Sequence, residues 1–185
     1  MYAICVYCGS RSGIRPEYEA VAAAFGQALA ERGWQLVYGG GSIGLMGVLA
    51  RAVLEHGGYV TGVIPQALLA AEVGLVEASD LIVVETLRER KALMDARSHA
   101  FVALPGGFGT FEELLEVITL RQLRYHDKPI LVLNQDGYYD PLQSLFSHAI
   151  AQGFVRPDQA HLYELVPNMD DILERLAVHR ARLNR

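Results

Sequence analysis

Residues Pro105–Glu116 read PGGFGTFEELLE, and this stretch decides the fold. It follows an apolar run, His99–Leu104, that is typical of a buried strand, and it leads into a helical pattern. A strand that ends in a glycine loop at a helix N-terminus attracts anions, because unpaired backbone N–H groups and about half a positive charge lie there. A negative residue, Glu113, follows this phosphate-type site. We therefore expect one substrate to span both, with its phosphate on the loop and its reacting carbon near the carboxylate.

Short β-rich runs alternate with longer helical runs along the whole chain. The predicted strands are Tyr2–Tyr7, Trp34–Tyr38, Tyr59–Ile64, Asp80–Val84, His99–Leu104 and Pro129–Leu133, with a further short apolar run at Leu162–Val166. The predicted helices are Pro16–Glu31, Leu45–His56, Thr86–Ser98, Thr110–Arg124, Tyr139–Gln152 and Met169–Arg182, and Gln66–Val76 suggests a short helix plus a loop. This alternation predicts an α/β fold, a doubly wound parallel sheet with helices on both faces, in a single domain spanning residues 1–185.

Composition excludes several classes of function. The formal net charge is −5, which argues against broad nucleic-acid binding through a basic surface. The N-terminus lacks a secretory pattern and no run is long enough to cross a membrane, so a cytoplasmic protein without a membrane partner is expected. A mean hydropathy of +0.19 agrees with some apolar surface being covered by another subunit.

Three glycine-rich segments follow predicted strands: Cys8–Gly13, Gly39–Gly47 and Pro105–Thr110. Ligands of parallel sheets bind outside the carboxyl ends of the strands, so we expect these segments to converge on one cleft. The second segment matches the G-x-G-x-x-G fingerprint of dinucleotide sites, which also requires an acid at the end of the next strand. That strand ends in Val63-Ile64-Pro65, and a mononucleotide site is therefore favoured. A simple tight turn remains the alternative for at least one segment.

Structural roles compete with functional ones for the charged residues. Thr110 and Glu113 have the spacing of a capping box, in which the glutamate only satisfies a backbone N–H group. Glu113 and Glu116 are expected on one helix face, with Glu112 pointing elsewhere. Arg90 and Lys91 could bind a phosphate or lie on a solvated face, where Lys91 would pair weakly with Asp95.

No residue pattern calls for a metal or a cofactor. Cys5 and Cys8 have C-x-x-C spacing, but an offset of three along a strand places them on opposite faces, and no second Cys/His pair accompanies them. A pyridoxal-phosphate enzyme needs a lysine for its Schiff base. The chain has two, Lys91 and Lys128, and neither context favours that role.

The chain resembles the Lonely Guy (LOG) family of cytokinin-activating phosphoribohydrolases, whose members have often been labelled "possible lysine decarboxylase". The pattern P-G-G-x-G-T-x-x-E, from Pro105 to Glu113, carries the resemblance most specifically. The other matching segments are CVYCGSRSG (Cys5–Gly13), LVYGGGSIGLMG (Leu36–Gly47), GVIP (Gly62–Pro65), RKALM (Arg90–Met94), ALPGGFGTFEELLEVIT (Ala103–Thr119) and HDKPILVLNQDGYYDPL (His126–Leu142).

The resemblance implies a Rossmann-like homodimer that hydrolyses the N-glycosidic bond of a nucleoside 5′-monophosphate without a cofactor or metal. Its products would be an adenine-type base and ribose 5-phosphate. By position, Glu113 and Arg90 match the family's catalytic glutamate and arginine. The residues matching substrate contacts are Gly107, Phe108, Gly109, Thr110, Phe111 and Glu112 in the central segment, and Glu72, Lys91 and Thr119 outside it. The glycine loops add Gly106, Gly40, Gly41 and Ser42 to the expected contacts.

Two departures from plant members concern the base. Those members usually have tryptophan where this chain has Leu120, and Met-His where it has Leu87-Arg88. The choice between a prenylated cytokinin nucleotide and plain AMP therefore stays open, as does the alternative of a non-catalytic nucleotide-binding protein or a carrier of another nucleotide.

Overall fold

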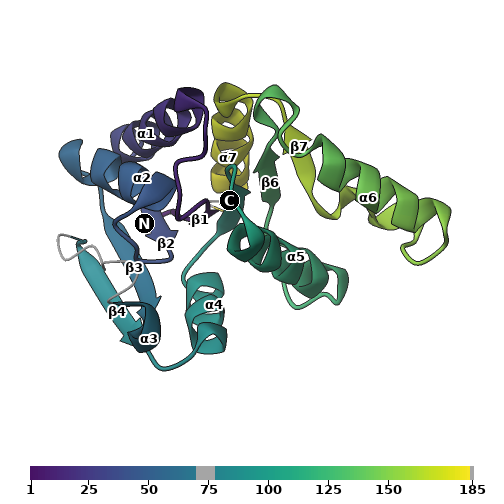
Figure 1. Ribbon diagram of the computed structural model, residues 1–185, viewed down its shortest axis with the longest axis horizontal. Helices are drawn as coiled ribbons and strands as arrows, with labels where there is room; N and C mark the ends of the chain where they lie inside the picture. Colours follow the sequence, from purple (N-terminus) through teal and green to yellow (C-terminus); the bar gives the residue numbers. More distant parts are fainter. Residues whose placement is uncertain (70–77, 184–185) are drawn as a thin grey trace.

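The computed structural model describes residues 1–69 and 78–183, which form one seven-stranded parallel sheet (Figure 1). Its strands are β1 (Ala3–Tyr7), β2 (Gln35–Tyr38), β3 (Val60–Pro65), β4 (Asp80–Val84), β5 (Ala100–Ala103), β6 (Ile130–Leu133) and β7 (Glu164–Val166). They lie in the order β4-β3-β2-β1-β5-β6-β7, and every neighbouring pair is parallel. The predicted α/β fold with a doubly wound sheet is confirmed.

Helices connect the strands as the sequence predicts. They are α1 (Pro16–Glu31), α2 (Gly44–Glu55), α3 (Gln66–Leu69), α4 (Leu87–Ala96), α5 (Phe108–Gln122), α6 (Asp140–Ala151) and α7 (Met169–Leu183), with 3₁₀ turns η1 (Gln135–Gly137) and η2 (Pro157–Leu162). Helices α1, α2 and α7 cover one face of the sheet, while α4 and α5 cover the other (Figure 1). Of the predicted helix and loop at Gln66–Val76, residues 70–76 lie outside the described residues.

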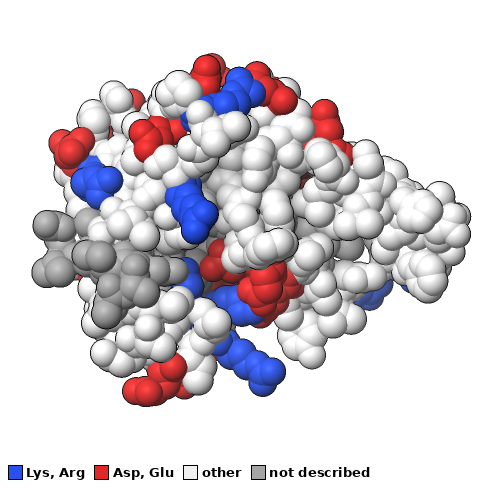
Figure 2. Space-filling view, in the orientation of Figure 1, with Lys and Arg blue, Asp and Glu red and all other residues white. Residues whose placement is uncertain are grey.

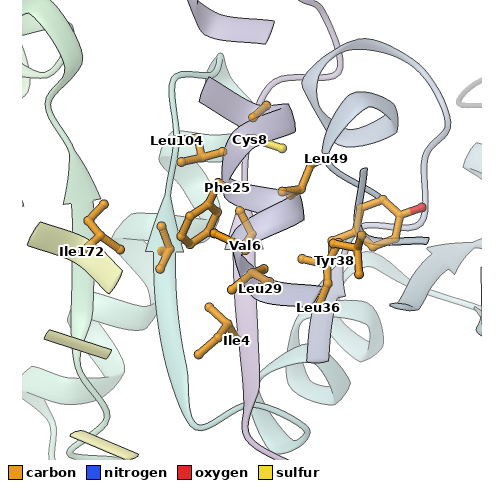
Figure 3. Packing of buried hydrophobic residues seen from close by; sticks show 14 of the residues in the cluster. Ile4, Val6, Cys8, Phe25, Leu29, Leu36, Tyr38, Leu49, Leu104 and Ile172 are labelled. Carbon is orange, nitrogen blue, oxygen red and sulfur yellow. The ribbon is translucent and has the colours of Figure 1, made fainter. Parts of the chain in front are cut away.

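The core consists of two apolar layers, one on each side of β1. Ile4 and Val6 point to the face covered by α1 and α2, where Phe25 and Leu49 pack against them (Figure 3). The alternate residues, such as Tyr7, point to the face covered by α4 and α5. Successive side chains of a strand point to opposite faces, so a strand buried on both sides is apolar throughout.

The two cysteines lie in different layers, as their spacing predicts. Cys5 belongs to the layer under α4 and α5, and Cys8 to the layer under α1 and α2. Both are buried, free thiols. Burial raises the pKa of each thiol well above its ordinary value, and the negative charge of Glu113 acts in the same direction. Neutral buried thiols are poor nucleophiles and poor metal ligands.

The order of the strands also locates a crevice. From β1 the chain builds outward through β2, β3 and β4, and then returns to add β5, β6 and β7 on the other side of β1. The loops that leave β1 and β5 therefore depart toward opposite faces. In doubly wound sheets this switch point is where ligands bind.

Candidate active site

The three glycine-rich segments meet at the carboxyl ends of β1, β2 and β5. The N–H group of Gly9 donates to Pro105 O (3.1 Å), and that of Met46 donates to Gly9 O (3.3 Å). These bonds tie the loop after β1 to the loop after β5 and to the first turn of α2. The expected convergence of the segments is therefore present in the structure.

A cavity of about 490 Å³ opens beside this junction. Residues 9–13 after β1 and residues 105–108 after β5 form its walls, with the side chains of Tyr18, Leu45 and Tyr138. The hydroxyl of Tyr138 donates to Gly106 O (2.5 Å), and the buried hydroxyl of Tyr139 donates to Leu104 O (2.7 Å). These two hydrogen bonds hold the loop after β5 in place. The only sequence signal for the two tyrosines is their position in the matching segment His126–Leu142.

The N-terminus of α5 adjoins this cavity. Gly107 is the N-cap, and no described side chain caps the helix. The first turn of a helix leaves backbone N–H groups without intrahelical partners, so this end can bind an anion. Gly107, Phe108 and Gly109 are exposed there.

The capping-box interpretation of Glu113 is wrong. Helix α5 begins at Phe108, two residues earlier than predicted, so Thr110 lies within the first turn instead of at its N-cap. The side chain of Thr110 is buried and packs against Gly106, where an added Cβ would lie 2.0 Å from Thr110 Oγ1. Glu113 is therefore not positioned to cap the helix.

Glu113 instead lies opposite Arg90 of α4. Arg90 Nη2 is 3.5 Å from Glu113 Oε1, and the two side chains are 8% and 12% exposed. Glu113 is the fifth residue after Phe108, which places its Cα about 7.5 Å along the helix from the Cα of Phe108. The structure thus brings the two predicted catalytic residues together.

A second charged contact lies beside the first. Lys91 binds Glu112 and Glu116, which are one turn apart on α5. Burial alone would lower the pKa of Lys91, but the hydrogen bonds to both glutamates outweigh it and raise the pKa. Adjacent Lys/Arg and Asp/Glu atoms are visible between α4 and α5 (Figure 2).

Two expectations about these charges are wrong. Asp95 pairs with Lys128 (2.5 Å), not with Lys91. Glu112, expected to point away from Glu116, shares its partner Lys91 with Glu116. With 3.6 residues per turn, residues four apart lie about 40° apart around the helix axis and residues three apart about 60°, so Glu112 and Glu116 share a face most closely.

The remaining predicted contacts that the structure describes do not line this cavity. Gly40 and Gly41 are buried after β2, and the carbonyl of Ser42 accepts a bond from Arg51 Nη1 (2.8 Å). Thr119 is exposed, and its hydroxyl donates to Leu115 O of its own helix. Glu72 lies outside the described residues. Phe111 is partly buried and packs edge-on against Tyr139.

Two negative findings apply to residues 1–69 and 78–183 alone. No group of three or more His, Cys, Asp or Glu side chains in these ranges could hold a metal ion. No helix in them is both long and apolar enough to cross a membrane.

The sheet, the glycine loops and the buried Arg–Glu pair together define a Rossmann-like α/β protein with a nucleotide-type site. A family model described as "Possible lysine decarboxylase" matches residues 46–176. The chain is 48% identical over 173 residues to the "Probable cytokinin riboside 5′-monophosphate phosphoribohydrolase LOGL1" of Oryza sativa subsp. japonica, covering 94% of this chain and 78% of the relative. It is 46% identical over 177 residues to LOG5 of Arabidopsis thaliana, a cytokinin riboside 5′-monophosphate phosphoribohydrolase, covering 96% and 78%.

The chain belongs to this LOG family, as its motifs predict. Among solved structures it resembles the molybdenum cofactor binding protein of Rippkaea orientalis (TM-score 0.73, 20% identity, 96% of both chains). It also resembles the Moco carrier protein of Chlamydomonas reinhardtii (TM-score 0.73, 21% identity, 98% of both chains). At this level of identity these likenesses show the shared fold alone.

Proposed function

We propose that the protein hydrolyses the N-glycosidic bond of a nucleoside 5′-monophosphate, a cytokinin riboside monophosphate or AMP, and releases the free base and ribose 5-phosphate. One observation carries the proposal. Glu113 pairs with Arg90 and lies about 7.5 Å along the helix whose uncapped N-terminus adjoins the cavity at the switch point. The named activity of the relatives supports the same reaction.

The phosphate is proposed to bind at the start of α5. The backbone N–H groups of its first turn and the exposed glycines Gly107 and Gly109 allow an anion to approach closely. An anchor at this point fixes the ribose relative to the carboxylate, and binding energy remote from the scissile bond then lowers the barrier.

Glu113 is proposed to act at the sugar. Breaking the bond between C1′ and the base nitrogen builds positive charge on C1′ and the ring oxygen, which a nearby carboxylate stabilises. The carboxylate also accepts a proton from the attacking water, whose oxygen forms the new bond to C1′ while the bonding pair leaves with the base. Arg90 fixes the orientation of this carboxylate through the buried ion pair.

The two lysines argue against a pyridoxal-phosphate decarboxylase, the activity in the description of the family model. Lys91 is held between Glu112 and Glu116, and Lys128 is held by Asp95. A Schiff base requires a free, neutral amine. The two carboxylates raise the pKa of Lys91 and favour its ammonium form, and the amine of Lys128 already donates to Asp95. These residues do not fit that cofactor.

We further infer that the protein acts as a homodimer. Helix α6 lies beyond the β7 edge of the sheet (Figure 1), and none of its described residues is buried. Leu145 on this helix and Phe154 just after it are exposed. Light scattering coupled to size exclusion would give twice the mass of one chain. A cytoplasmic location stays a prediction from the sequence.

The test offers AMP, isopentenyladenosine 5′-monophosphate and adenosine to the purified protein and measures the free base. We expect both monophosphates to be cleaved, and adenosine to react at least about 100-fold more slowly because it lacks the anchor. The ratio of the rates of base release from the two monophosphates identifies the preferred base. Equal rates for AMP and adenosine would remove the anchoring argument, and no base from either monophosphate would favour a non-catalytic binding protein.

A further inference from the structure

We propose that Gly39 is a positioning residue for the site, because its missing side chain provides the space in which the Arg90 guanidinium reaches Glu113. The effect on turnover rests on the proposed function, but the steric relation between Gly39 and Arg90 does not. The proposal gives a role to the first glycine of the G-x-G-x-x-G pattern, which otherwise suggests a dinucleotide.

The close approach is direct. Gly39 is the residue that follows β2, and it is buried. A Cβ atom added to it would lie 1.9 Å from Arg90 Nη2 and 2.9 Å from Arg90 Cζ. Nη2 is also the atom that lies 3.5 Å from Glu113 Oε1. A methyl group at position 39 would therefore displace the atom that contacts the carboxylate.

Backbone conformation does not explain the glycine at this position. Gly40 and Gly44 have φ values of +79° and +59°, in the region that disfavours other residues. Gly39 is not among the residues with positive φ. The turn after β2 therefore needs glycine at positions 40 and 44, whereas position 39 needs it for space.

Packing stability does not explain the position of Arg90 either. Its side chain is buried, yet no described group accepts a hydrogen bond from its Nε atom. A buried donor without an acceptor lowers stability. A buried guanidinium that lowers stability in this way is expected to serve the site. The absence of a side chain at Gly39 provides the space that this guanidinium occupies.

A double-mutant cycle tests this relation. Gly39→Ala is made in the natural chain and in Arg90→Met, which retains the apolar stem and removes the guanidinium. In the natural chain we expect Gly39→Ala to lower Tm by roughly 5 °C and to reduce turnover of a nucleoside monophosphate about 100-fold. In the Arg90→Met chain the same change should lower Tm by less than about 2 °C and reduce turnover no further.

Gly58→Ala is the matched control. An added Cβ there would lie 2.6 Å from Val53 Cγ1, away from the charged pair. We expect it to lower Tm by the same amount in both chains and to leave turnover unchanged.

Every outcome decides the proposal. Equal Tm losses from Gly39→Ala in both chains would overturn it, because the clash would then not involve the guanidinium. The Gly39→Ala variant of the natural chain could fail to fold. In that case a folded double variant supports the proposal. A double variant that does not fold, although Arg90→Met alone folds, overturns it. If the protein releases no base at all, the proposed function fails, while the Tm cycle still decides the role of Gly39.

Discussion

Two charged contacts join α4 to α5, and they differ in depth. Arg90 and Glu113, the inner pair, are 8% and 12% exposed. In the outer cluster, Lys91 is 14% exposed, but its partners Glu112 and Glu116 are 60% and 37% exposed. The cations are neighbours in the sequence, and so are Glu112 and Glu113.

Depth decides what each contact can do. A buried carboxylate acts strongly on nearby charge because little water screens it. An exposed cluster is screened by water and salt and contributes little to stability. We therefore expect the inner pair to carry the chemistry and the outer cluster to be dispensable for it.

The largest expected effect separates Glu113 of the inner pair from Glu116 of the outer cluster. Glu113→Gln should reduce turnover of the preferred monophosphate about 10²- to 10⁴-fold, because the amide neither accepts the proton of water nor stabilises positive charge at C1′. The measurement is free base released under saturating substrate. Glu116→Gln, on the same helix one turn further on, is the control and should retain turnover within about threefold. A fully active Glu113→Gln would show that the inner pair is structural.

The second effect concerns stability. Arg90→Met removes the guanidinium that pairs with the buried Glu113 carboxylate, and we expect the free energy of unfolding to fall by about 3–5 kcal/mol. Adding Glu113→Leu should recover most of this loss, because an apolar pair needs no compensation for buried charge. Urea unfolding followed by circular dichroism measures both. Failure of the second change to recover stability would contradict the ion pair as the cause.

Sequence patterns predicted the layers of this fold well, because they depend on local periodicity. The apolar runs at β1 and β5 are present, and the helix predicted from Thr86 begins at Leu87 with Thr86 as its N-cap. The inner pair was identified by resemblance to a family and by position, not by spacing. Spacing alone favoured a cap for Glu113, because nothing local showed that α5 would begin at Phe108.

The pairing of charges could not be predicted from one helix at a time. Lys91 was expected to pair with Asp95 on its own helix, yet it reaches Glu112 and Glu116 on α5. Which partner a charged residue finds depends on how α4 and α5 pack side by side on one face of the sheet, and this packing involves residues far apart in sequence. The space that Gly39 leaves for Arg90 is a contact of the same kind.

The third effect concerns the two buried cysteines. Burial, together with the charge of Glu113, raises the pKa of the Cys5 and Cys8 thiols in the folded protein. The unfolded chain releases these protons near pH 9, so the stabilisation is complete below that pH and is lost as pH rises above it. By pH 10 the loss should be about 1 kcal/mol per thiol.

Cys8→Ala tests this pH dependence. Its free energy of unfolding should fall less between pH 8 and pH 10 than that of the natural chain, measured by urea unfolding at each pH. The buried tyrosines also have raised pKa values, but their contribution to the pH dependence is present in both chains and cancels in the comparison. Identical slopes would mean that the Cys8 thiol ionises as readily folded as unfolded.

The smallest expected effect belongs to the outer cluster. Lys91→Met should lower the free energy of unfolding by about 1 kcal/mol or less in dilute buffer, and the loss should shrink in 1 M NaCl. In the natural chain, salt weakens the attraction between Lys91 and the two glutamates. In Lys91→Met, salt weakens the repulsion that remains between Glu112 and Glu116. Urea is the suitable denaturant because it adds no ions. The matched variant is Arg90→Met. Its larger loss of unfolding free energy should persist in high salt, because ions in solution do not reach the buried inner pair. Losses that respond equally to salt would mean that depth does not distinguish the two contacts.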